Sequence, residues 1–596
     1  MYVTSAENNA SAENNANMCG DIRGDVGGAM CDDVCDDRRR QPNSASPRVL
    51  LVDFQAEDAE YSVPLGCACV GSALLDTGLV DRENLRIIAP RLGEDKTQLA
   101  RRCLESKPSI VGFSLYCWNS GESAELARLL RRAEPSVALI AGGPDAELFA
   151  SGDTGDCPFD EIFLGPAETS VQTWIRAHCA CGGRARESRD SCRSPATKPR
   201  IIQPEPVDFT KITSPWLNGC AVPPENHEVL WELTRGCPYH CSYCYEGRGL
   251  SAVQHIPTER LESELALFVR RGVEKVFVLD PTFNLQRDRA LSLLATMREK
   301  GGGIFWYFEI RAELLDARQA KAFGELNCSV QIGLQSAQKR VMDTIGRSFD
   351  RELFVKKIEL LNGAGVVFGF DLIYGLPGDT LGGFRDSLDF ALSLYPNHLD
   401  IFPLSVLPGT SLHGQRGQFR FDCDITPPYR LNGQPSFPAR DMAMAGAIAH
   451  ACDVFYTLGR AVPWFNAVLQ PLDMRSSAFF QKIADETESR FPSQGCASDM
   501  LHRDIEAFQC EVLQAAYERQ GKAEMVPAVL DLVRYNGALS RAFAEGETTR
   551  LKLSYPLAAV DGGEILDVEG FAGEYKIHPC TVLIKPGIDG PIVKIV

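Results

Sequence analysis

The chain has 596 residues, of which 44% are hydrophobic and 23% are charged, and its formal net charge is -18. This length exceeds what one hydrophobic core supports, so three or four folding units are expected. The polar start lacks a basic segment followed by an apolar run, and no stretch approaches the roughly 18 apolar residues of a transmembrane helix. We therefore expect a cytoplasmic protein without membrane attachment, and the acidic balance argues against a nucleic-acid partner.

The 21 cysteines favour free thiols and metal ligation over disulfides, because disulfide frameworks belong to small secreted chains. Several cysteines lie in apolar surroundings and are expected to be small core residues. These are Cys67, Cys103, Cys328 and Cys452. A second group, Cys19, Cys31 and Cys35, lacks the second ligand pair of a metal site and is expected to bind nothing.

Residues 1–47 contain a near-duplicated SAENNA and no apolar period, so they are expected to form a tail. From 48 to 178, short apolar runs alternate with segments of helical spacing. The runs are RVLLVDF, LRIIAP, SIVGFSLY, VALIAGGP and EIFLG. This alternation predicts an α/β domain with a doubly wound (Rossmann-like) parallel sheet that binds ligands beyond the carboxyl ends of its strands.

The polar stretch that opens residues 179–227 predicts a linker. Residues 228–413 contain six further strand-like runs with helical connectors, which predict a partial (β/α)6 TIM-type barrel with its site at the carboxyl ends of the strands. Residues 414–596 combine amphipathic helices with short strand candidates near the end, so a mainly helical C-terminal domain is expected.

Three cysteines follow the first strand-like run of this barrel, in WELTRGCPYHCSYCYEGRG. They are Cys237, Cys241 and Cys244. Four cysteines would saturate an iron–sulfur cluster, whereas three leave one iron with an open coordination position. The alternatives are a zinc site or unrelated core cysteines. Zinc normally takes a fourth protein ligand, and His240 is too close in sequence to serve comfortably. The spacing thus predicts a catalytic cluster on these three metal-binding thiolates.

The C-x-x-x-C-x-x-C pattern, with Tyr243 before the last cysteine, resembles the signature of radical S-adenosylmethionine (SAM) enzymes. The resemblance implies a 4Fe-4S cluster whose fourth iron is chelated by S-adenosylmethionine, and a reducing partner such as flavodoxin or ferredoxin. It also implies cofactor contacts at the ends of the following strands, although LDPTFN departs from the Gly-Gly-Glu form of the family. Taken singly, each stretch also fits barrel packing. The implied contacts are Tyr243, Asp280, Asn284, Glu309, Arg311, Gln335, Ser336 and Tyr374.

The domain in front resembles the cobalamin-binding domain of one large radical SAM subclass. The resemblance implies cobalamin contacts at its strand ends, with glycines that let the backbone approach a large flat ligand. The implied contacts are Ser114, Tyr116, Trp118, Gly142, Gly143, Gly165 and Glu168. The D-x-H-x-x-G sequence is absent and no histidine precedes His178, so the cobalt would lack a protein imidazole. The alternative is a domain that binds nothing, or another nucleotide.

The whole chain looks similar to cobalamin-dependent radical SAM enzymes that include tryptophan-methyltransferase-like proteins. This resemblance implies methyl transfer from S-adenosylmethionine through cobalamin to an unactivated carbon or phosphorus of a small molecule or peptide. One alternative is a radical cyclase or rearrangement enzyme in which cobalamin carries electrons. A second is a non-catalytic iron–sulfur redox sensor. Residues 427–430 and 463–467 are candidates for lining a substrate pocket, with helix packing as the alternative.

Overall fold

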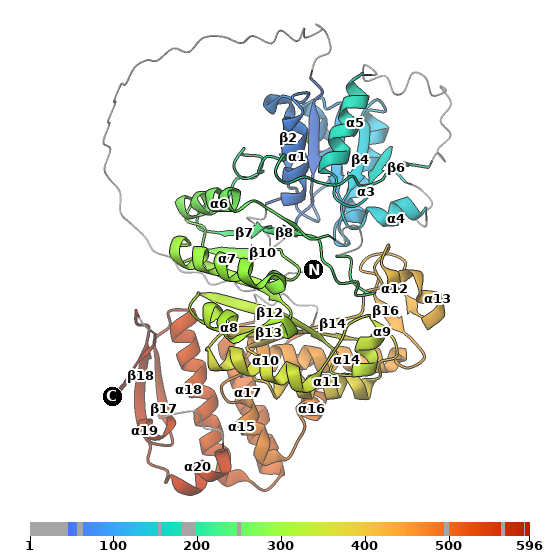
Figure 1. The fold of residues 1–596 in the computed structure, drawn as a ribbon. Coiled ribbons are helices and arrows are strands. Elements are labelled where there is room, and N and C mark those ends of the chain that lie inside the picture. The colour runs from blue at the N-terminus through green and yellow to red at the C-terminus, as the bar shows by residue number, and fades with distance from the viewer. Residues whose placement is uncertain are drawn as a thin grey trace, which may run out of the picture.

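The computed structural model describes residues 46–56, 63–152, 157–180, 198–246, 252–493, 500–561, 567–588 and 590–596. A front domain, coloured blue to teal in Figure 1, lies above a green and yellow barrel, and orange and red helices lie below it. Residues 1–45, with their three cysteines, lie outside the described residues. Among the described residues, no helix has the length and apolarity needed to cross a bilayer.

The front domain is built on a six-stranded parallel sheet in the order β2-β1-β3-β4-β5-β6. The expected doubly wound fold is confirmed, and one strand from the stretch expected to be a linker joins it by pairing with β5. The strands are β1 (Val49–Val52), β2 (Leu85–Ile88), β3 (Ile110–Ser114), β4 (Ala138–Gly142), β5 (Glu161–Phe163) and β6 (Arg200–Ile202). Chain order reverses between β1 and β3, so ligands are expected beyond their carboxyl ends.

Helices cover both faces of this sheet, which explains why β1 and β3 are buried along their whole length. Two helices pack on each face: α1 with α5, and α2 with α3. The bounds are α1 (Leu65–Asp76), α2 (Lys96–Glu105), α3 (Ser120–Ala133), α4 (Ala146–Ser151) and α5 (Glu168–Ala180). The start of α2 is fixed by the Asp95 side chain, which accepts hydrogen bonds from the backbone N–H groups of residues 97 and 98.

The second sheet is also parallel and six-stranded, in the order β14-β13-β12-β11-β10-β7. This confirms the expected partial barrel. Its strands are β7 (Glu228–Trp231), β10 (Lys275–Val278), β11 (Phe305–Ile310), β12 (Cys328–Gln335), β13 (Val367–Tyr374) and β14 (His398–Pro403). The helices on its outside are α6 (Thr258–Arg270), α7 (Arg287–Lys300), α8 (Ala317–Gly324), α9 (Lys339–Thr344), α10 (Arg351–Gly363) and α11 (Leu381–Leu392). A short antiparallel pair, β8 (Thr234–Arg235) with β9 (Gln254–His255), follows β7.

The two faces of the barrel strands differ in burial. Outward side chains are buried under the helices: Trp231 packs edge-on against a ring of α6 and donates from Nε1 to Glu264, 2.7 Å away. Inward side chains stay partly exposed, as shown by Leu230 at 36%, Leu279 at 43% and Phe402 at 41%. A closed barrel fills its interior with side chains. The inner surface of this partial barrel is therefore accessible to a ligand.

The C-terminal part is mainly helical, as expected, and ends in a small antiparallel sheet. Its hydrophobic core is continuous with that of the barrel. Trp464 and Phe465 are each 2% exposed, so helix packing accounts for residues 463–467. The elements are α12 (Ser411–Gly414), α13 (Arg416–Phe419), β15 (Asp422–Cys423), β16 (Leu431–Gly433), α14 (Ala439–Cys452), α15 (Phe465–Leu469), α16 (Ser476–Arg490), α17 (His502–Arg519), α18 (Val526–Ala544), β17 (Thr549–Leu553), α19 (Leu557–Val560), α20 (Val568–Glu574), β18 (Cys580–Lys585) and β19 (Ile592–Ile595).

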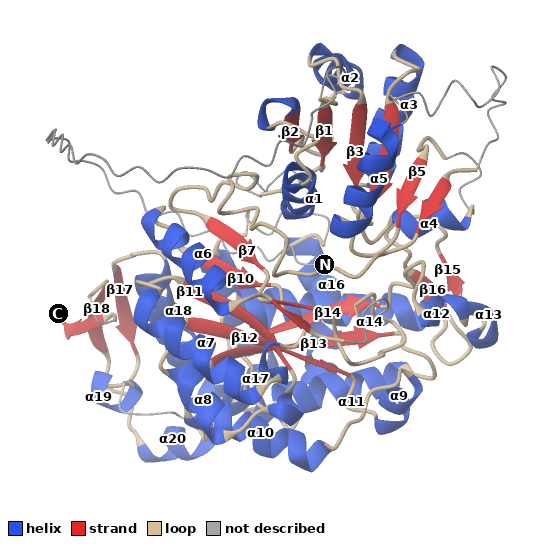
Figure 2. Ribbon diagram, turned by 45° about the horizontal axis from the view of Figure 1, so that its top comes forward, coloured by secondary structure: helices blue, strands red, loops and turns tan. Residues whose placement is uncertain are grey.

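The carboxyl ends of the two parallel sheets face each other, as Figure 2 shows from a second angle. Glu168, which follows β5, forms an ion pair with Arg235, which follows β7. Asp145, which follows β4, accepts a hydrogen bond from Tyr429, beyond β14. Because ligands of parallel α/β sheets bind at these ends, the two predicted cofactor sites open toward one another.

Candidate functional site

The three predicted cluster cysteines lie on one loop directly after β8. The loop starts at Gly236, whose φ of 93° is a conformation that side chains other than glycine rarely adopt. Cys244 N–H donates to the Cys241 carbonyl over 3.0 Å, which makes a tight turn between two of the thiols. The middle of the turn is anchored to the barrel, because Ser242 N–H donates to the residue 345 carbonyl over 3.0 Å.

Burial raises the pKa of the Cys237 thiol and raises that of Cys244 to about 12. Neighbouring cysteines also raise these pKa values, so the three thiols lie within electrostatic range of one another. No three His, Cys, Asp or Glu side chains among the described residues are gathered closely enough to hold a single metal ion. A four-iron cluster binds each thiolate to a different iron, so it needs three thiols around one larger space. Three thiols on one loop are the protein ligands that such a cluster would take.

Arg311 places a positive charge beside the cysteine loop. Its guanidinium carbon lies 3.7 Å from the ring centroid of Tyr239, between the first two cysteines, and its Nε donates to Glu313 over 2.6 Å. Asn284 holds the backbone of Arg311 on both sides: its Nδ2 donates to the carbonyl over 3.0 Å and its Oδ1 accepts from the N–H over 3.1 Å. Asn284 therefore positions Arg311, and each polar atom of its side-chain amide has a backbone partner.

A second guanidinium, Arg347, also lies beside the cysteine loop and is not predicted from the sequence. It hydrogen-bonds the Tyr243 hydroxyl and the Gly333 carbonyl, so it joins the cysteine loop to β12. Nothing local in the sequence marks this arginine, which is 103 positions from the last cysteine. Together the two arginines offset the negative charge of thiolates and of any bound carboxylate.

Three of the predicted S-adenosylmethionine contacts have structural partners. Asp280 is 3% exposed, and its Oδ1 accepts from the backbone N–H groups of Leu233 and Thr234, each over 2.9 Å. Burial raises the pKa of Asp280 to about 7. Ser336 accepts from a backbone N–H and contacts a serine of α11, while Tyr374 is buried against the rings of α11 and residue 437. These side chains hold the upper rim of the barrel together.

Gln335 differs from that group because one of its polar atoms is unsatisfied. It ends β12 with a φ of 63°, where the pairing with β13 shifts register. The residue is 7% exposed, and its Oε1 is buried without a hydrogen-bond partner in the described structure. A buried acceptor without a donor is costly unless a ligand supplies the donor. The amino or hydroxyl groups of S-adenosylmethionine fit this need. Glu309 faces the same inner surface from β11.

A polar network spans the inner face of the last three strands and was also missed from the sequence. Gln331 Nε2 donates to Asp371 over 2.6 Å and to Asp400 over 2.8 Å, while its Oε1 lies 2.7 Å from His398 Nε2. His398 must be the donor, because the amide oxygen only accepts. Burial raises the pKa of both aspartates to about 6. Gly369 leaves the gap that the network crosses, since a Cβ there would lie 2.1 Å from the His398 Nε2.

At the front domain, the predicted contacts Ser114, Tyr116 and Trp118 lie at or directly after the carboxyl end of β3. The rings of Tyr116 and Trp118 are stacked, with centroids 4.4 Å apart, and Trp118 is 46% exposed. Asn119 holds this turn against β1 by donating to Asp53 Oδ1 over 3.1 Å. A stacked aromatic pair whose outer ring, Trp118, is exposed lies where strand order reverses, and it fits a large flat ring system such as a corrinoid.

The predicted glycines serve the protein's own packing. A Cβ at Gly143, whose φ is 101°, would lie 2.6 Å from the Leu115 carbonyl oxygen. At Gly165, with a φ of 64°, it would lie 3.1 Å from Pro204, and at Gly142 it would make ordinary contacts. Gly143 and Gly165 therefore allow neighbouring loops to approach closely at the sheet edge, whereas Gly142 is not required for such an approach.

His178 cannot serve as a ligand at this edge. It lies near the end of α5, ten residues and thus about 15 Å along the helix axis from Glu168 at the edge. There its imidazole stacks on Trp174, with ring centroids 4.9 Å apart. A corrinoid at the aromatic pair would therefore have no imidazole from the described part of the front domain beneath its cobalt.

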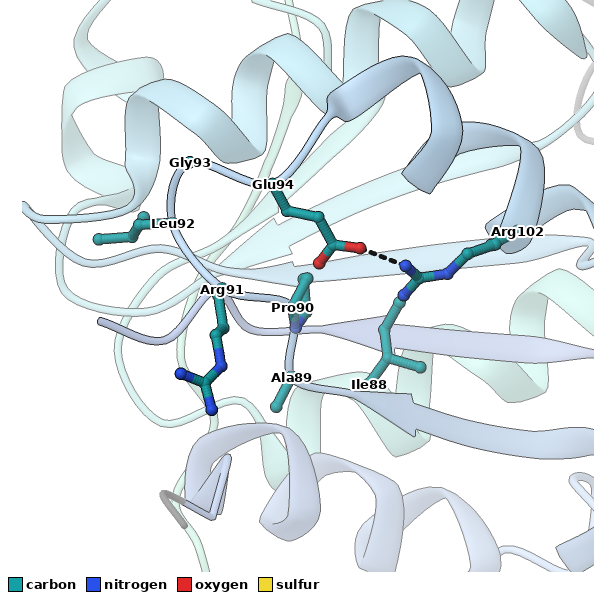
Figure 3. A pocket seen from close by; sticks show the side chains of 8 residues that line it. All are labelled: Ile88, Ala89, Pro90, Arg91, Leu92, Gly93, Glu94 and Arg102. Atoms are coloured by element: carbon teal, nitrogen blue, oxygen red, sulfur yellow. Dashed lines mark hydrogen bonds and ion pairs between the residues drawn. The ribbon is translucent and has the colours of Figure 1, made fainter. Parts of the chain in front are cut away.

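A hollow of about 680 Å³ lies beside this edge, at the carboxyl end of β2 (Figure 3). Its size is within the range of small-molecule sites. Figure 3 shows Glu94 and Arg102 paired across one side. The sequence had suggested no site here. The lining residues are Ile88, Ala89, Pro90, Arg91, Leu92, Gly93, Glu94 and Arg102.

Comparisons with known proteins agree with this geometry. Residues 231–391 match the Radical SAM superfamily, and this range contains the cysteine loop. The chain is 24% identical over 335 residues to the cobalamin-dependent radical SAM methyltransferase TokK of Streptomyces tokunonensis, covering 52% of this chain and 48% of TokK. It is also 24% identical to an uncharacterized methyltransferase of Pyrococcus horikoshii, over 61% of this chain and 82% of that protein.

The fold is shared with OxsB, a cobalamin-dependent S-adenosylmethionine radical enzyme. The structure of OxsB with aqua-cobalamin and S-adenosylmethionine bound has a TM-score of 0.52 and 12% identity, over 82% of this chain and 83% of OxsB. The chain spans about half the length of TokK, the first of these relatives. Residues 231–391 thus match the radical SAM superfamily, and the chain is similar in sequence to proteins named as methyltransferases and in fold to OxsB.

Proposed function

We propose that this chain is a radical SAM methyltransferase that holds a 4Fe-4S cluster on Cys237, Cys241 and Cys244 and cobalamin on its front domain. The observation that carries the proposal is the opposition of the two sheets: the cysteine loop and the Tyr116–Trp118 pair both lie at carboxyl edges that face each other. A redox sensor would not need a second cofactor domain directed at its cluster.

When bound, the cluster supplies an electron to S-adenosylmethionine and cobalamin supplies a methyl carrier. The chain's own residues hold these groups, orient them and shield them from water. Arg311 and Arg347 stabilise negative charge around the cysteine loop, and Gln335 Oε1 accepts a hydrogen bond from S-adenosylmethionine. Trp118 and Tyr116 support the flat face of the corrin ring.

The substrate in this proposal is a small molecule or peptide, methylated at an unactivated carbon or phosphorus. It enters along the inner face of the barrel, where apolar side chains remain exposed. The electron comes from a soluble reductant such as flavodoxin or ferredoxin, in the cytoplasm. TokK and two further relatives at 24–25% identity are named as methyltransferases, whereas a relative at 20% identity is named as a cyclase, so methyl transfer is favoured over cyclisation.

The test is S-adenosylmethionine cleavage by the full chain, reconstituted without oxygen with iron, sulfide and hydroxocobalamin. With dithionite as reductant, we expect 5′-deoxyadenosine and S-adenosylhomocysteine, measured by mass spectrometry. Cys241→Ala should abolish both products, whereas Cys423→Ala, which removes a thiol of the C-terminal part, should keep them. Formation of neither product by the reconstituted wild type would overturn the proposal.

A further inference from the structure

Arg235 is the last residue of β8 and lies two positions before Cys237. Its guanidinium donates two hydrogen bonds to the Glu232 carboxylate, from Nε over 2.6 Å and from Nη2 over 2.7 Å. Its remaining terminal nitrogen, Nη1, donates to Glu168 over 2.6 Å. The first two bonds fix the side chain within the barrel rim. The third reaches the front domain, 67 positions away in the sequence.

Glu168 is the first residue of α5, at the edge where cobalamin is expected. The sequence suggested it as a cofactor contact, but its carboxylate is engaged by Arg235. The guanidinium also lies over the ring of Phe209, 4.8 Å from its centroid, in the segment that joins the two domains. The guanidinium of Arg235 therefore contacts the barrel rim, the front domain and the segment between them.

Burial makes this group of three charged side chains costly in desolvation free energy. The side chains of Arg235, Glu168 and Glu232 are only 18%, 5% and 20% exposed, and one positive charge serves two carboxylates. Desolvated ion pairs contribute little net stability, but removing one partner leaves uncompensated charge. Such a group is better suited to fixing two surfaces in one geometry than to raising overall stability.

Another contact also joins the two domains. The Tyr429 hydroxyl donates to Asp145 over 2.6 Å, at the carboxyl end of β4. That contact connects the edge of the front-domain sheet to the segment that follows β14. Arg235 differs because only Gly236 separates it from the first cluster cysteine. Arg235 is thus the interdomain contact that lies next to the cysteine loop in the chain.

We propose that Arg235 is a positioning residue that fixes the cysteine loop against the carboxyl edge of the front domain and so sets the separation of the two cofactor sites. The contact to Glu168 is the part that crosses between the domains. The identity of the two cofactors rests on the proposed function, whereas the contact itself does not.

The test uses the cofactor-free full chain and three variants. Arg235→Lys keeps the charge but cannot bond to both carboxylates with the same geometry. Glu168→Gln leaves the Arg235–Glu232 pair intact, so the barrel rim should stay folded. The matched control is Arg475→Lys, which alters an exposed guanidinium that bridges two carboxylates of α11 far from the site. Hydrogen–deuterium exchange is followed by mass spectrometry.

We expect amides of residues 236–246 and 165–170 to exchange at least tenfold faster in Arg235→Lys and in Glu168→Gln, and to be unchanged in Arg475→Lys. Exchange in β12 and β13 should stay slow in all variants. Unchanged exchange in the two site variants would overturn the proposal. Equally faster exchange throughout the barrel would also overturn it, because that result indicates general destabilisation.

Pulsed electron paramagnetic resonance on the reconstituted chain supplies the second readout. The distance distribution between reduced cluster and cob(II)alamin should broaden in Glu168→Gln relative to Arg475→Lys, and an unchanged distribution would contradict the positioning role. If the wild type binds neither cofactor, the proposed function fails. The exchange measurement then still decides whether Arg235 positions the loop.

Discussion

Two substitutions at Asp280 distinguish whether its side chain holds the backbone before the cysteine loop or binds a cofactor. In Asp280→Ala, the N–H groups of Leu233 and Thr234 lose their acceptor in a site that is 3% exposed. Each unsatisfied buried donor costs about 1–2 kcal/mol, so the variant should lose about 3 kcal/mol of stability. Asp280→Asn keeps a carbonyl oxygen at the same place and should retain both hydrogen bonds.

The stability of the wild type should change with pH in a defined direction. Burial raises the Asp280 pKa from 3.8 to about 7, so the folded state favours the neutral carboxyl, and the stability that this carboxyl contributes is lost as the pH rises through about 7. The full shift corresponds to at most about 4 kcal/mol. This loss runs from about pH 4, the pKa of the unfolded state, up to about pH 7, so Asp280→Asn, which is neutral at every pH, should differ little from the wild type at pH 4 and exceed its stability at pH 8.

Urea unfolding of the cofactor-free chain at both pH values measures these differences, and iron content after anaerobic reconstitution reports on the cysteine loop. We expect Asp280→Asn to bind iron like the wild type and Asp280→Ala to bind less. If the Asn variant is as defective as the Ala variant in both assays, the carboxylate charge itself is required, and the anchoring role is refuted.

Two other substitutions test the contacts that shape the site. Gly369→Ala should lower the free energy of unfolding by about 2–3 kcal/mol, because its Cβ would collide with the His398 imidazole. The control Gly363→Ala, which has open space at its Cβ, should not lower it. The midpoints of urea unfolding measure both effects, and equal effects would contradict the role of Gly369. Tyr429→Phe removes the hydrogen bond from its hydroxyl to the buried Asp145 and should cost about 1–3 kcal/mol in the same assay. An unchanged midpoint in Tyr429→Phe would show that the contact does not hold the domains together.

The elements that the sequence predicted are those encoded by local pattern. The five apolar runs of the front domain and the six of the barrel form strands because β-branched and apolar residues recur there between helical segments. The cysteine loop was found from spacing alone. The strand at Arg200–Ile202 was missed, because it has three residues in a polar stretch and is defined by its pairing with β5.

The roles of side chains were harder to predict, because they depend on partners that are distant in the sequence. Asn284 and Glu168 were suggested as cofactor contacts, yet one holds the Arg311 backbone and the other binds Arg235. Arg347 lies beside the cysteine loop but is separated from it by four strands of the chain. Motif position indicates which rim a residue occupies, and only the folded structure shows whether its polar atoms are free for a ligand.

The central claim is that three thiolates hold a four-iron cluster with one iron open to S-adenosylmethionine. The direct measurement is the electron paramagnetic resonance spectrum of the anaerobically reconstituted and reduced full chain, recorded with iron content, before and after addition of S-adenosylmethionine. We predict about four irons per chain and a spectrum whose g values change when S-adenosylmethionine is added. Protein without iron, or a cluster signal that S-adenosylmethionine leaves unchanged, would contradict the account.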